Sequence, residues 1–262
     1  MTLQERFSQL STQGEKALVV YVTAGDPPLD QLPAILESLQ EGGADIIEVG
    51  MPFSDPIGDG PTIQASSQRA LDRGTTPTAV FDMLAQVRLQ TPLVIMCYAN
   101  TVMNIGARDF AYRCRQVRVS GVIVVDAIPE AIQEWRPQFA SAGVDLIYLA
   151  APTSTEERLK ALSEVAQGFI YVVSRTGVTG TENSAGTNLN QLIENLRKYS
   201  KLPLCVGFGI STPEQIKEIC NIADGAVVGS HIVNLLNKEW KLGAGKERLI
   251  KEIALLKSGT KQ

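Results

Sequence analysis

Short apolar runs recur along the whole chain, and each is separated from the next by a longer segment of mixed polarity. Within a run the apolar residues are nearly continuous, as in 122–125, rather than alternating with polar ones. Continuous apolarity is typical of parallel strands that are covered on both faces. The predicted strands are 17–23, 46–49, 93–98, 121–125, 145–149, 169–173, 204–208 and 225–228.

The segments between these runs place apolar residues at helical spacing, and several begin with a helix start signal. Thr212, for example, precedes Pro213 and is followed three residues later by Gln215. The predicted helices are 32–41, 61–73, 78–88, 108–117, 129–142, 155–166, 189–199 and 213–222.

Eight strand–helix units in 262 residues predict an α/β fold, a closed (β/α)8 TIM barrel that occupies residues 1–262 as a single domain. An open doubly wound sheet is disfavoured because no glycine-rich turn resembles a dinucleotide-binding fingerprint. An amphipathic segment with Leu3, Phe7 and Leu10 precedes the first strand. We expect it to form an extra N-terminal helix that caps the amino-terminal end of the barrel.

Composition narrows the classes of function. Hydrophobic residues make up 44% of the chain and charged residues 20%, which is enough for one large core. The net charge is −4 and no basic stretch could follow a phosphate backbone, which disfavours nucleic acid as a partner. No apolar run approaches the roughly 18 residues that span a bilayer, and residues 2–16 do not resemble a secretory signal. We expect a cytoplasmic protein without membrane association.

The cysteines and the histidine limit metal and nucleophile chemistry. Cys97, Cys114, Cys205 and Cys220 form no C-x-x-C pair, so we expect mostly buried thiols. His231 is the only histidine, which excludes a histidine-cluster metal site and leaves acid–base chemistry to the carboxylates. We expect a structural role for His231.

Carboxylates gather where the second predicted strand ends. Glu48 interrupts its apolar run, and Asp55 and Asp59 follow in a loop that prolines and glycines stiffen. Burying an unpaired carboxylate is costly unless it has a partner or a function. A strand-end glutamate that simply reaches solvent is the alternative, but three carboxylates around a shaped loop favour an acid–base site.

The other predicted strand ends carry further polar candidates, because barrel active sites are built from the loops that follow the strands. These candidates are 23–27, Tyr98, Asn100, Asp126, Tyr171, Ser174 and Arg175. A run rich in Gly, Thr and Ser then extends over 175–187. Its length and position predict a lid that closes over the site, a merely flexible connection being the alternative.

Two glycine clusters, 207–211 and 229–230, follow the last two predicted strands. Glycines let backbone N–H groups approach a phosphate, and a helix that begins near Ser230 would aim its amino terminus at the same point. Barrels often bind phosphate between these two loops, although tight turns alone are the alternative. The residues predict a small phosphorylated substrate and proton transfer by carboxylates, with isomerisation, aldol-type cleavage and decarboxylation all open.

Several of these segments resemble one enzyme family. The similarity to the tryptophan synthase alpha subunit lies in 47–56, 59–64, 21–27, 98–100, 151–153, 174–180, 207–211 and 229–230. The resemblance covers essentially the whole chain. It implies a carbon–carbon lyase of tryptophan biosynthesis, which cleaves indole-3-glycerol phosphate to indole and glyceraldehyde 3-phosphate by a retro-aldol reaction. It also implies no metal or organic cofactor in this subunit.

The resemblance assigns roles to individual residues. Glu48 would be the principal acid–base group, moving a proton between the C3′ hydroxyl and indole C3. Asp59 would lie beside the indole N–H and stabilise the positive charge of the indolenine tautomer, which requires an ionised carboxylate. Tyr98 and Tyr171 would flank the indole, and Thr179 would hold Asp59 in the closed state. The implied substrate-binding residues are Tyr21, Tyr98, Tyr171, Thr179, Gly180, Phe208, Gly209, Gly229 and Ser230, of which Gly180, Gly209, Gly229 and Ser230 would hold the phosphate.

The family works with a pyridoxal-phosphate-dependent β subunit in an α2β2 heterotetramer, so we expect that partner and direct transfer of indole to it. The sequence departs from the family pattern at Thr101, 117–120 and 127–128, all expected in loops that meet the β subunit. Gly58 is a further departure, expected to loosen the catalytic loop. Two alternatives stay open: a standalone or specialised indole-3-glycerol-phosphate lyase, and a weakly active regulatory subunit of the β enzyme.

Overall fold

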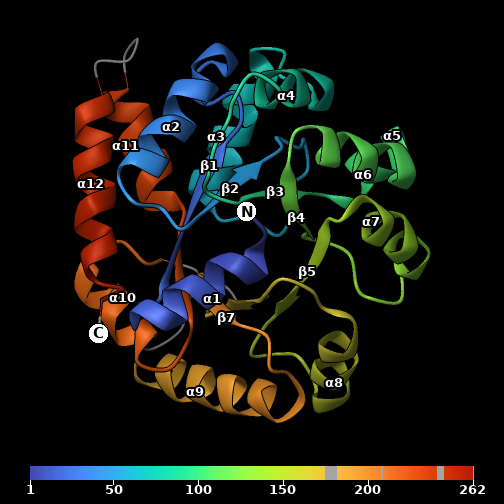
Figure 1. The fold of residues 1–262 in the computed structure, drawn as a ribbon, viewed down its shortest axis with the longest axis vertical. Helices are drawn as coiled ribbons and strands as arrows, with labels where there is room; N and C mark the ends of the chain where they lie inside the picture. The colour runs from blue at the N-terminus through green and yellow to red at the C-terminus, as the bar shows by residue number, and fades with distance from the viewer. Residues whose placement is uncertain (175–181, 208, 241–244, 262) are drawn as a thin grey trace.

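The strands form a closed barrel in the computed structural model of the chain (Figure 1). Each strand pairs in parallel with the next in sequence, and β8 pairs with β1. The predicted TIM barrel is therefore confirmed. The strands are β1 (Ala17–Thr23), β2 (Ile46–Gly50), β3 (Leu93–Cys97), β4 (Val119–Val124), β5 (Asp145–Ala150), β6 (Ile170–Val173), β7 (Leu204–Gly207) and β8 (Gly225–Val228).

The structure describes residues 1–174, 182–207, 209–240 and 245–261, and of residues 182–188 the backbone alone. Helices surround the barrel as an outer ring (Figure 1). They are α1 (Leu3–Gln13), α2 (Leu32–Glu41), α3 (Pro61–Asp72), α4 (Pro77–Leu84), α5 (Ala99–Ile105), α6 (Ala107–Gln116), α7 (Arg136–Ala142), α8 (Glu156–Val165), α9 (Glu182–Tyr199), α10 (Pro213–Cys220), α11 (Ser230–Glu239) and α12 (Lys246–Ser258), with short 3-10 turns at η1 (Leu29–Gln31) and η2 (Gln133–Trp135).

Local sequence explains where several helices begin. Thr2 and Glu5 form a capping box at the start of α1, and Thr212 and Gln215 form one at the start of α10. Each box provides partners for backbone N–H groups that the first turn of a helix cannot bond internally. The predicted start at Pro213 is confirmed.

Two apolar layers stabilise the barrel. The larger layer lies between the strands and the outer helices, and the smaller one fills the barrel interior. Leu3 of α1 belongs to the interior layer, and the ring of Phe7 meets that of Phe169 edge-on, with centroids 6.0 Å apart. α1 thus lies across the barrel opening (Figure 1), and the expected N-terminal cap is confirmed. All four cysteines are buried as thiols.

Three helix boundaries differ from the predicted ones. The helix expected at 78–88 ends at Leu84, and the Arg88 guanidinium then binds the carbonyls of Ala85 and Val87. The helix expected at 129–142 begins only at Arg136, because Pro137 supplies no N–H for a continuous helix. α9 begins at Glu182 rather than 189, so the predicted lid run over 175–187 is partly helical.

Three further differences concern connections. Two observed helices, α5 and α12, were not among the eight predicted ones. α5 is short and its apolar residues lack helical spacing. α12 follows the last expected strand–helix unit. The turn 117–120 joins α6 to β4 at the amino-terminal end of the barrel, where the Ser120 hydroxyl donates to the Met1 carbonyl. The expectation that this turn shares a surface with Thr101 and 127–128 is therefore wrong, because those residues follow the carboxyl ends of strands.

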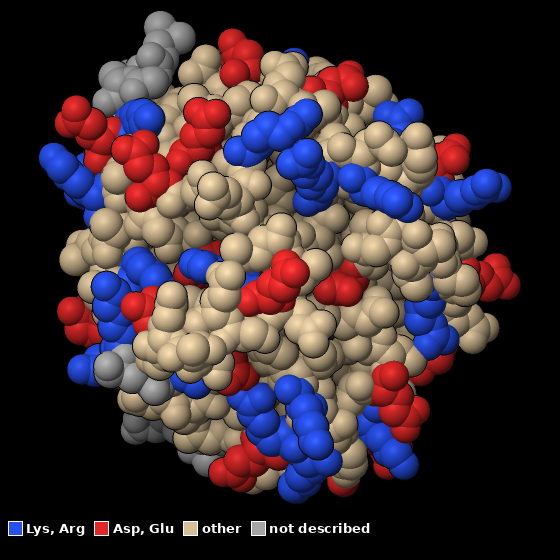
Figure 2. All heavy atoms as spheres, in the orientation of Figure 1, with Lys and Arg blue, Asp and Glu red and all other residues tan. Residues whose placement is uncertain are grey.

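Basic and acidic side chains are interspersed on the face that carries α1 (Figure 2). A row of basic side chains lies across the upper right of this face, and acidic side chains are scattered over the rest of it (Figure 2). The net charge of the whole chain is −4. Among the helices of the described residues, none has the length and apolarity that crossing a bilayer requires.

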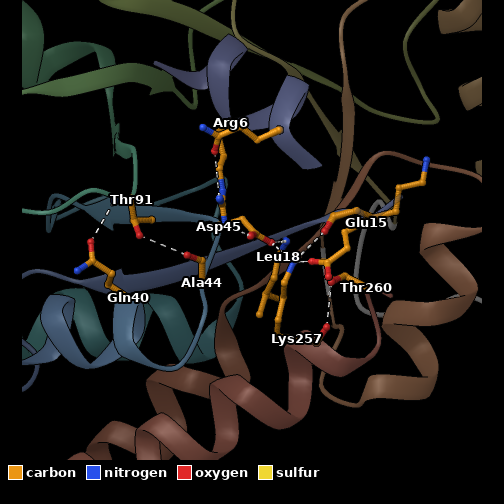
Figure 3. Close-up of polar contacts among 11 residues, drawn as sticks. Arg6, Glu15, Leu18, Gln40, Ala44, Asp45, Thr91, Lys257 and Thr260 are labelled. Carbon is orange, nitrogen blue, oxygen red and sulfur yellow. Dashed lines mark hydrogen bonds and ion pairs between the residues drawn. The ribbon is translucent and has the colours of Figure 1, made fainter. Parts of the chain in front are cut away.

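A buried carboxylate joins the two ends of the chain at the amino-terminal end of the barrel (Figure 3). Asp45 is 0% exposed and accepts hydrogen bonds from the Leu18 N–H at 2.6 Å and Lys257 Nζ at 2.8 Å. It also pairs with Arg6 of α1. Asp45 therefore ties α1 and α12 to the strands β1 and β2.

Replacing this carboxylate should destabilise the fold. Asp45→Asn is expected to lower the free energy of unfolding by about 3 kcal/mol, because it leaves Arg6 and Lys257 without their buried counter-charge. Urea unfolding measures the change. Glu130→Gln is the control, since its ion pair with Arg158 is exposed and contributes at most about 1 kcal/mol. Equal losses in the two variants would show that Asp45 does not anchor the ends.

Candidate active site

A cavity of about 200 Å³ opens at the carboxyl ends of the strands. Its walls come from β1, β2, β3, β6 and β8 and from the loops that follow β2, β7 and β8. The lining residues are Tyr21, Glu48, Asp59, Gly60, Pro61, Thr62, Ile63, Met96, Tyr171, Val227, Gly209, Gly229 and Ser230. The position is the one that barrel enzymes use for catalysis.

Glu48 enters the barrel interior because side chains alternate along β2. Ile46 packs in the interior layer, whereas Ile47 and Val49 pack in the outer one, so Glu48 points inward with Ile46. Its side chain is 1% exposed, and Oε2 has no hydrogen-bond partner among the described residues. Burial, and secondly the charge of Asp59, raise the pKa of Glu48 from 4.5 to about 8. Glu48 is therefore protonated at neutral pH and positioned to donate.

Asp59 lies at the end of the loop that follows β2. The loop is folded by backbone bonds from the Ile57 N–H to the Asp55 carbonyl and from the Asp59 N–H to the Pro56 carbonyl, at 2.9 and 3.0 Å. The Tyr98 hydroxyl donates to Asp59 Oδ2 at 3.1 Å. Burial raises the pKa of Asp59 to about 6, against the hydrogen bond from Tyr98, which lowers it. Asp59 is thus mostly ionised at neutral pH while Glu48 is not.

Two tyrosines cross the barrel mouth because glycines on neighbouring strands make room for them. A Cβ at Gly50 would lie 2.1 Å from Tyr21 Oη, and one at Gly207 would lie 2.4 Å from Tyr171 Oη. Burial raises the pKa of both tyrosines well above 10, so both hydroxyls keep their protons. The Tyr21 hydroxyl is 3.1 Å from Thr23 Oγ1, which orients it towards β1.

The loops after β7 and β8 bring Gly209, Gly229 and Ser230 to the same cavity. Gly209 has a φ of 78°, which favours glycine, and a Cβ there would meet nothing within 4 Å. Gly229 precedes α11 without a side-chain cap, so the first N–H groups of this helix lack intrahelical partners. Unpaired N–H groups at a helix amino terminus and a hydroxyl such as that of Ser230 are the donors that anions use in proteins.

His231 follows the anion-binding residues but does not line the cavity. Its Nε2 lies 2.7 Å from Glu252 Oε1 of α12, a contact that joins α11 to α12. Within the described part of the chain, no three His, Cys, Asp or Glu side chains gather as a metal site would require.

The sequence model of the tryptophan synthase alpha chain matches residues 7–261. The chain belongs to the tryptophan synthase alpha chain family. It is 45% identical over 238 residues to the tryptophan synthase alpha chain of Citrifermentans bemidjiense, covering 90% of this chain and 89% of that one. It is 43% identical over 237 residues to a Saccharomyces cerevisiae protein named tryptophan synthase, covering 89% of this chain and 34% of that one. The structure of Mycobacterium tuberculosis tryptophan synthase matches with a TM-score of 0.90 and 33% identity, over 99% of this chain and 98% of that chain.

The structure brings most of the predicted site residues of this alpha chain together. Those that line one cavity are Glu48, Asp59, Tyr21, Tyr171, Gly209, Gly229 and Ser230. Tyr98 does not line it; it lies behind Asp59 and reaches the site through that carboxylate. Thr179, Gly180 and Phe208, together with Arg175 and the first part of the predicted lid, lie outside the described residues.

Several strand-end candidates lie away from the cavity of this alpha chain. Asp55 and Asn100 are exposed, and neither lines the cavity. Asp126 accepts from the Ala99 N–H at 2.7 Å, which caps α5. Asp26 is buried in a bidentate pair with Arg69 of α3. Asp126 and Asp26 thus have structural partners that their position after a strand does not reveal.

Sequence reasoning missed the apolar part of the lining. Met96 of β3 and Val227 of β8 face the cavity, with Ile63 at the start of α3. In a run of continuous apolar residues the inward positions look like the outward ones, so composition could not identify them. Strand pairing places Val94 beside Glu48, and the two-residue period of a strand then places Met96 on the same inward face. This period is the signal that could have identified the apolar lining residues.

Neutralising the buried glutamate should stabilise the fold in a pH-dependent way. Between pH 4.5 and about 8 the folded chain holds a proton on Glu48 that the unfolded chain has released, so the unfolding free energy falls by up to about 1.4 kcal/mol per pH unit. Glu48→Gln is expected to raise the unfolding free energy at pH 8 and to change it little below pH 4.5, as urea unfolding would measure. A gain that is the same at both pH values would contradict the burial of an uncompensated carboxylate.

Proposed function

We propose that this chain cleaves indole-3-glycerol phosphate into indole and glyceraldehyde 3-phosphate by a retro-aldol reaction, the lyase reaction of tryptophan biosynthesis. The observation that carries the proposal is one cavity with a protonated carboxyl at Glu48, an ionised one at Asp59 and an anion-binding helix terminus at Ser230. Each group matches one part of the substrate or of its transition state.

The phosphate sets the orientation that we propose for the substrate in the cavity. The phosphate binds to the amides near Gly209, Gly229 and Ser230. The indole then lies among Met96, Val227 and Ile63, an apolar group that suits an aromatic ring. This direction leaves the glycerol carbons beside Glu48 and turns the indole N–H towards Asp59.

Proton transfer proceeds in two steps with one residue. The Glu48 carboxyl gives its proton to indole C3, which forms the indolenine cation, and the Asp59 carboxylate stabilises the positive charge on nitrogen. The bond between C3 and C3′ then breaks, and its electron pair returns to the ring to form indole. The C3′ hydroxyl gives its proton to Glu48 as the carbonyl of glyceraldehyde 3-phosphate forms. Glu48 ends in its starting state, and the protonated ring is the only electron sink, so we propose that this subunit uses no cofactor.

Cleavage should require Glu48 to be protonated and Asp59 to be ionised. The kcat/KM for indole release is expected to be bell-shaped, falling below pH 6 as Asp59 gains a proton and above pH 8 as Glu48 loses one. Glu48→Gln and Asp59→Asn should each lower kcat/KM by at least about 100-fold, because one cannot transfer a proton and the other cannot balance the cation. Turnover within a few fold of the parent chain in either variant would exclude the assigned role.

We also propose that the chain acts in the cytoplasm, where a phosphorylated substrate is retained, as the α half of an α2β2 heterotetramer with a tryptophan synthase β subunit. Apolar side chains are exposed on segments that follow the carboxyl ends of β2, β3 and β4: Ile57 at 77%, Met103 at 66% and Ile128 at 47%. Exposed apolar groups around a site mark an interaction surface. This chain matches 34% of the yeast relative named tryptophan synthase, so that protein contains further sequence beside the matched part.

The partnership is tested by adding a β subunit from the same source to the purified chain. Indole release is expected to rise by about tenfold or more, the size of a typical coupling between sites. Met103→Asp and Ile128→Asp should abolish the stimulation and spare the basal rate, whereas Leu255→Asp, an exposed site on α12, should change neither. Fast release without stimulation would identify a standalone lyase, and stimulation of the β enzyme without release would identify a regulatory subunit.

A further inference from the structure

Gly58 is exposed to solvent, but the place that its side chain would occupy is already filled. Its φ lies outside the left-handed region, so its backbone conformation does not require glycine. A Cβ at this position, however, would lie 2.5 Å from Val125 Cγ1 and 3.3 Å from Tyr98 Oη. The glycine therefore permits a close approach of the loop to Val125 and Tyr98. The flexibility expected of this loop from the sequence stays a prediction.

Val125 lies directly after β4, beside the end of β3, and these two strands are paired neighbours (Figure 1). Its N–H donates to the Cys97 carbonyl at 2.9 Å, which continues the β3–β4 pairing by one residue. Its side chain packs against the interior apolar layer. The valine is therefore held by the barrel itself and cannot yield easily to a new neighbour.

Tyr98 connects this contact to the active site. Its buried ring stacks on Phe53, with centroids 4.8 Å apart and an interplanar angle of 13°. Its hydroxyl accepts from the Gly58 N–H at 3.0 Å and donates to Asp59 Oδ2 at 3.1 Å. Because the hydroxyl has one proton, the bond from Gly58 leaves that proton for Asp59.

We propose that Val125 and Gly58 form a size-complementary pair that positions Asp59, with Val125 as a positioning residue for the cleavage reaction. The valine methyl occupies the place of a side chain at 58, and the bare backbone at 58 can then reach the Tyr98 hydroxyl. A methyl group at 58 moves the loop away from Tyr98 and with it the carboxylate of Asp59. The kinetic consequence rests on the proposed function; the structural pairing does not.

The pair is tested by adding a methyl group at position 58 and removing the valine methyl groups at position 125. Gly58→Ala is expected to lower kcat by about tenfold or more, with KM changed less, because displacements near 1 Å cost rates of this order. The acid limb of the pH profile should move to higher pH, since the Tyr98 bond that lowers the pKa of Asp59 is weakened. The double variant Gly58→Ala with Val125→Ala should regain most of the activity and the original limb, because the new methyl fills the space that the valine leaves.

Val124→Ala in the Gly58→Ala background is the matched control. Val124 belongs to the outer apolar layer, so its truncation removes the same atoms without relieving the contact at 58. Val124→Ala should therefore not rescue activity. Thermal melting of all variants distinguishes a loss of folded protein from a misplaced Asp59. A Gly58→Ala enzyme within about twofold of the parent in kcat and in its acid limb would overturn the proposal, as would equal rescue by Val124→Ala.

Hydrogen exchange gives a readout that does not depend on catalysis. The amide of residue 58 is expected to exchange faster in Gly58→Ala than in the parent chain and to regain protection with Val125→Ala but not with Val124→Ala. If the parent chain releases no indole, the proposed function fails while this pattern still supports the pair. Unchanged protection in Gly58→Ala overturns the pair whatever the activity.

Discussion

The pairing of β1 with β8 is the constraint on which the rest of the molecule depends, because it turns a row of parallel strands into a closed wall. Closure makes all carboxyl ends converge at one opening, and the two-residue period of a strand then decides which side chains point into it. Tyr21 and Glu48 are direct partners in the β1–β2 register, so they enter the cavity at the same level. A shift of one residue in that register would place Glu48 in the outer layer and remove the acid from the site.

Two buried carboxylates, one at each end of the barrel, differ in how completely their oxygens are paired. Asp45, at the amino-terminal end, is surrounded by an amide and two cations and serves to hold α1 and α12. Glu48, at the other end, has one oxygen without a partner among the described residues. An unpaired buried carboxyl opposes folding, and the closely packed layers around β2 maintain it. The fully paired carboxylate therefore contributes structure, and the unpaired one is the group to which we assign proton transfer.

The architecture was predictable from the sequence because its signal is repeated. Apolar runs of about the same length mark every strand, and Glu48 and Asp59 interrupt the pattern in a way that points to a site. Features that depend on distance in space were not predictable. Tyr98 stands next to a strand end like any lining residue, yet its hydroxyl bonds place it behind Asp59. The start of α9 at Glu182 was missed because Gly, Ser and Thr favour a loop reading, which tertiary context overrides.

In the reaction that we propose, the different pKa values of Glu48 and Asp59 allow one glutamate to act first as an acid and then as a base. Before reaction, burial and the negative charge of Asp59 keep the proton on Glu48. Once that proton reaches indole C3, a cation lies between the two carboxylates, and an opposite charge favours the ionised form of each. The same charge that Asp59 stabilises therefore also stabilises the Glu48 carboxylate. When the carbon–carbon bond breaks the cation disappears, the pKa of Glu48 rises again, and the carboxylate becomes basic enough to take the C3′ hydroxyl proton at the moment the aldehyde forms.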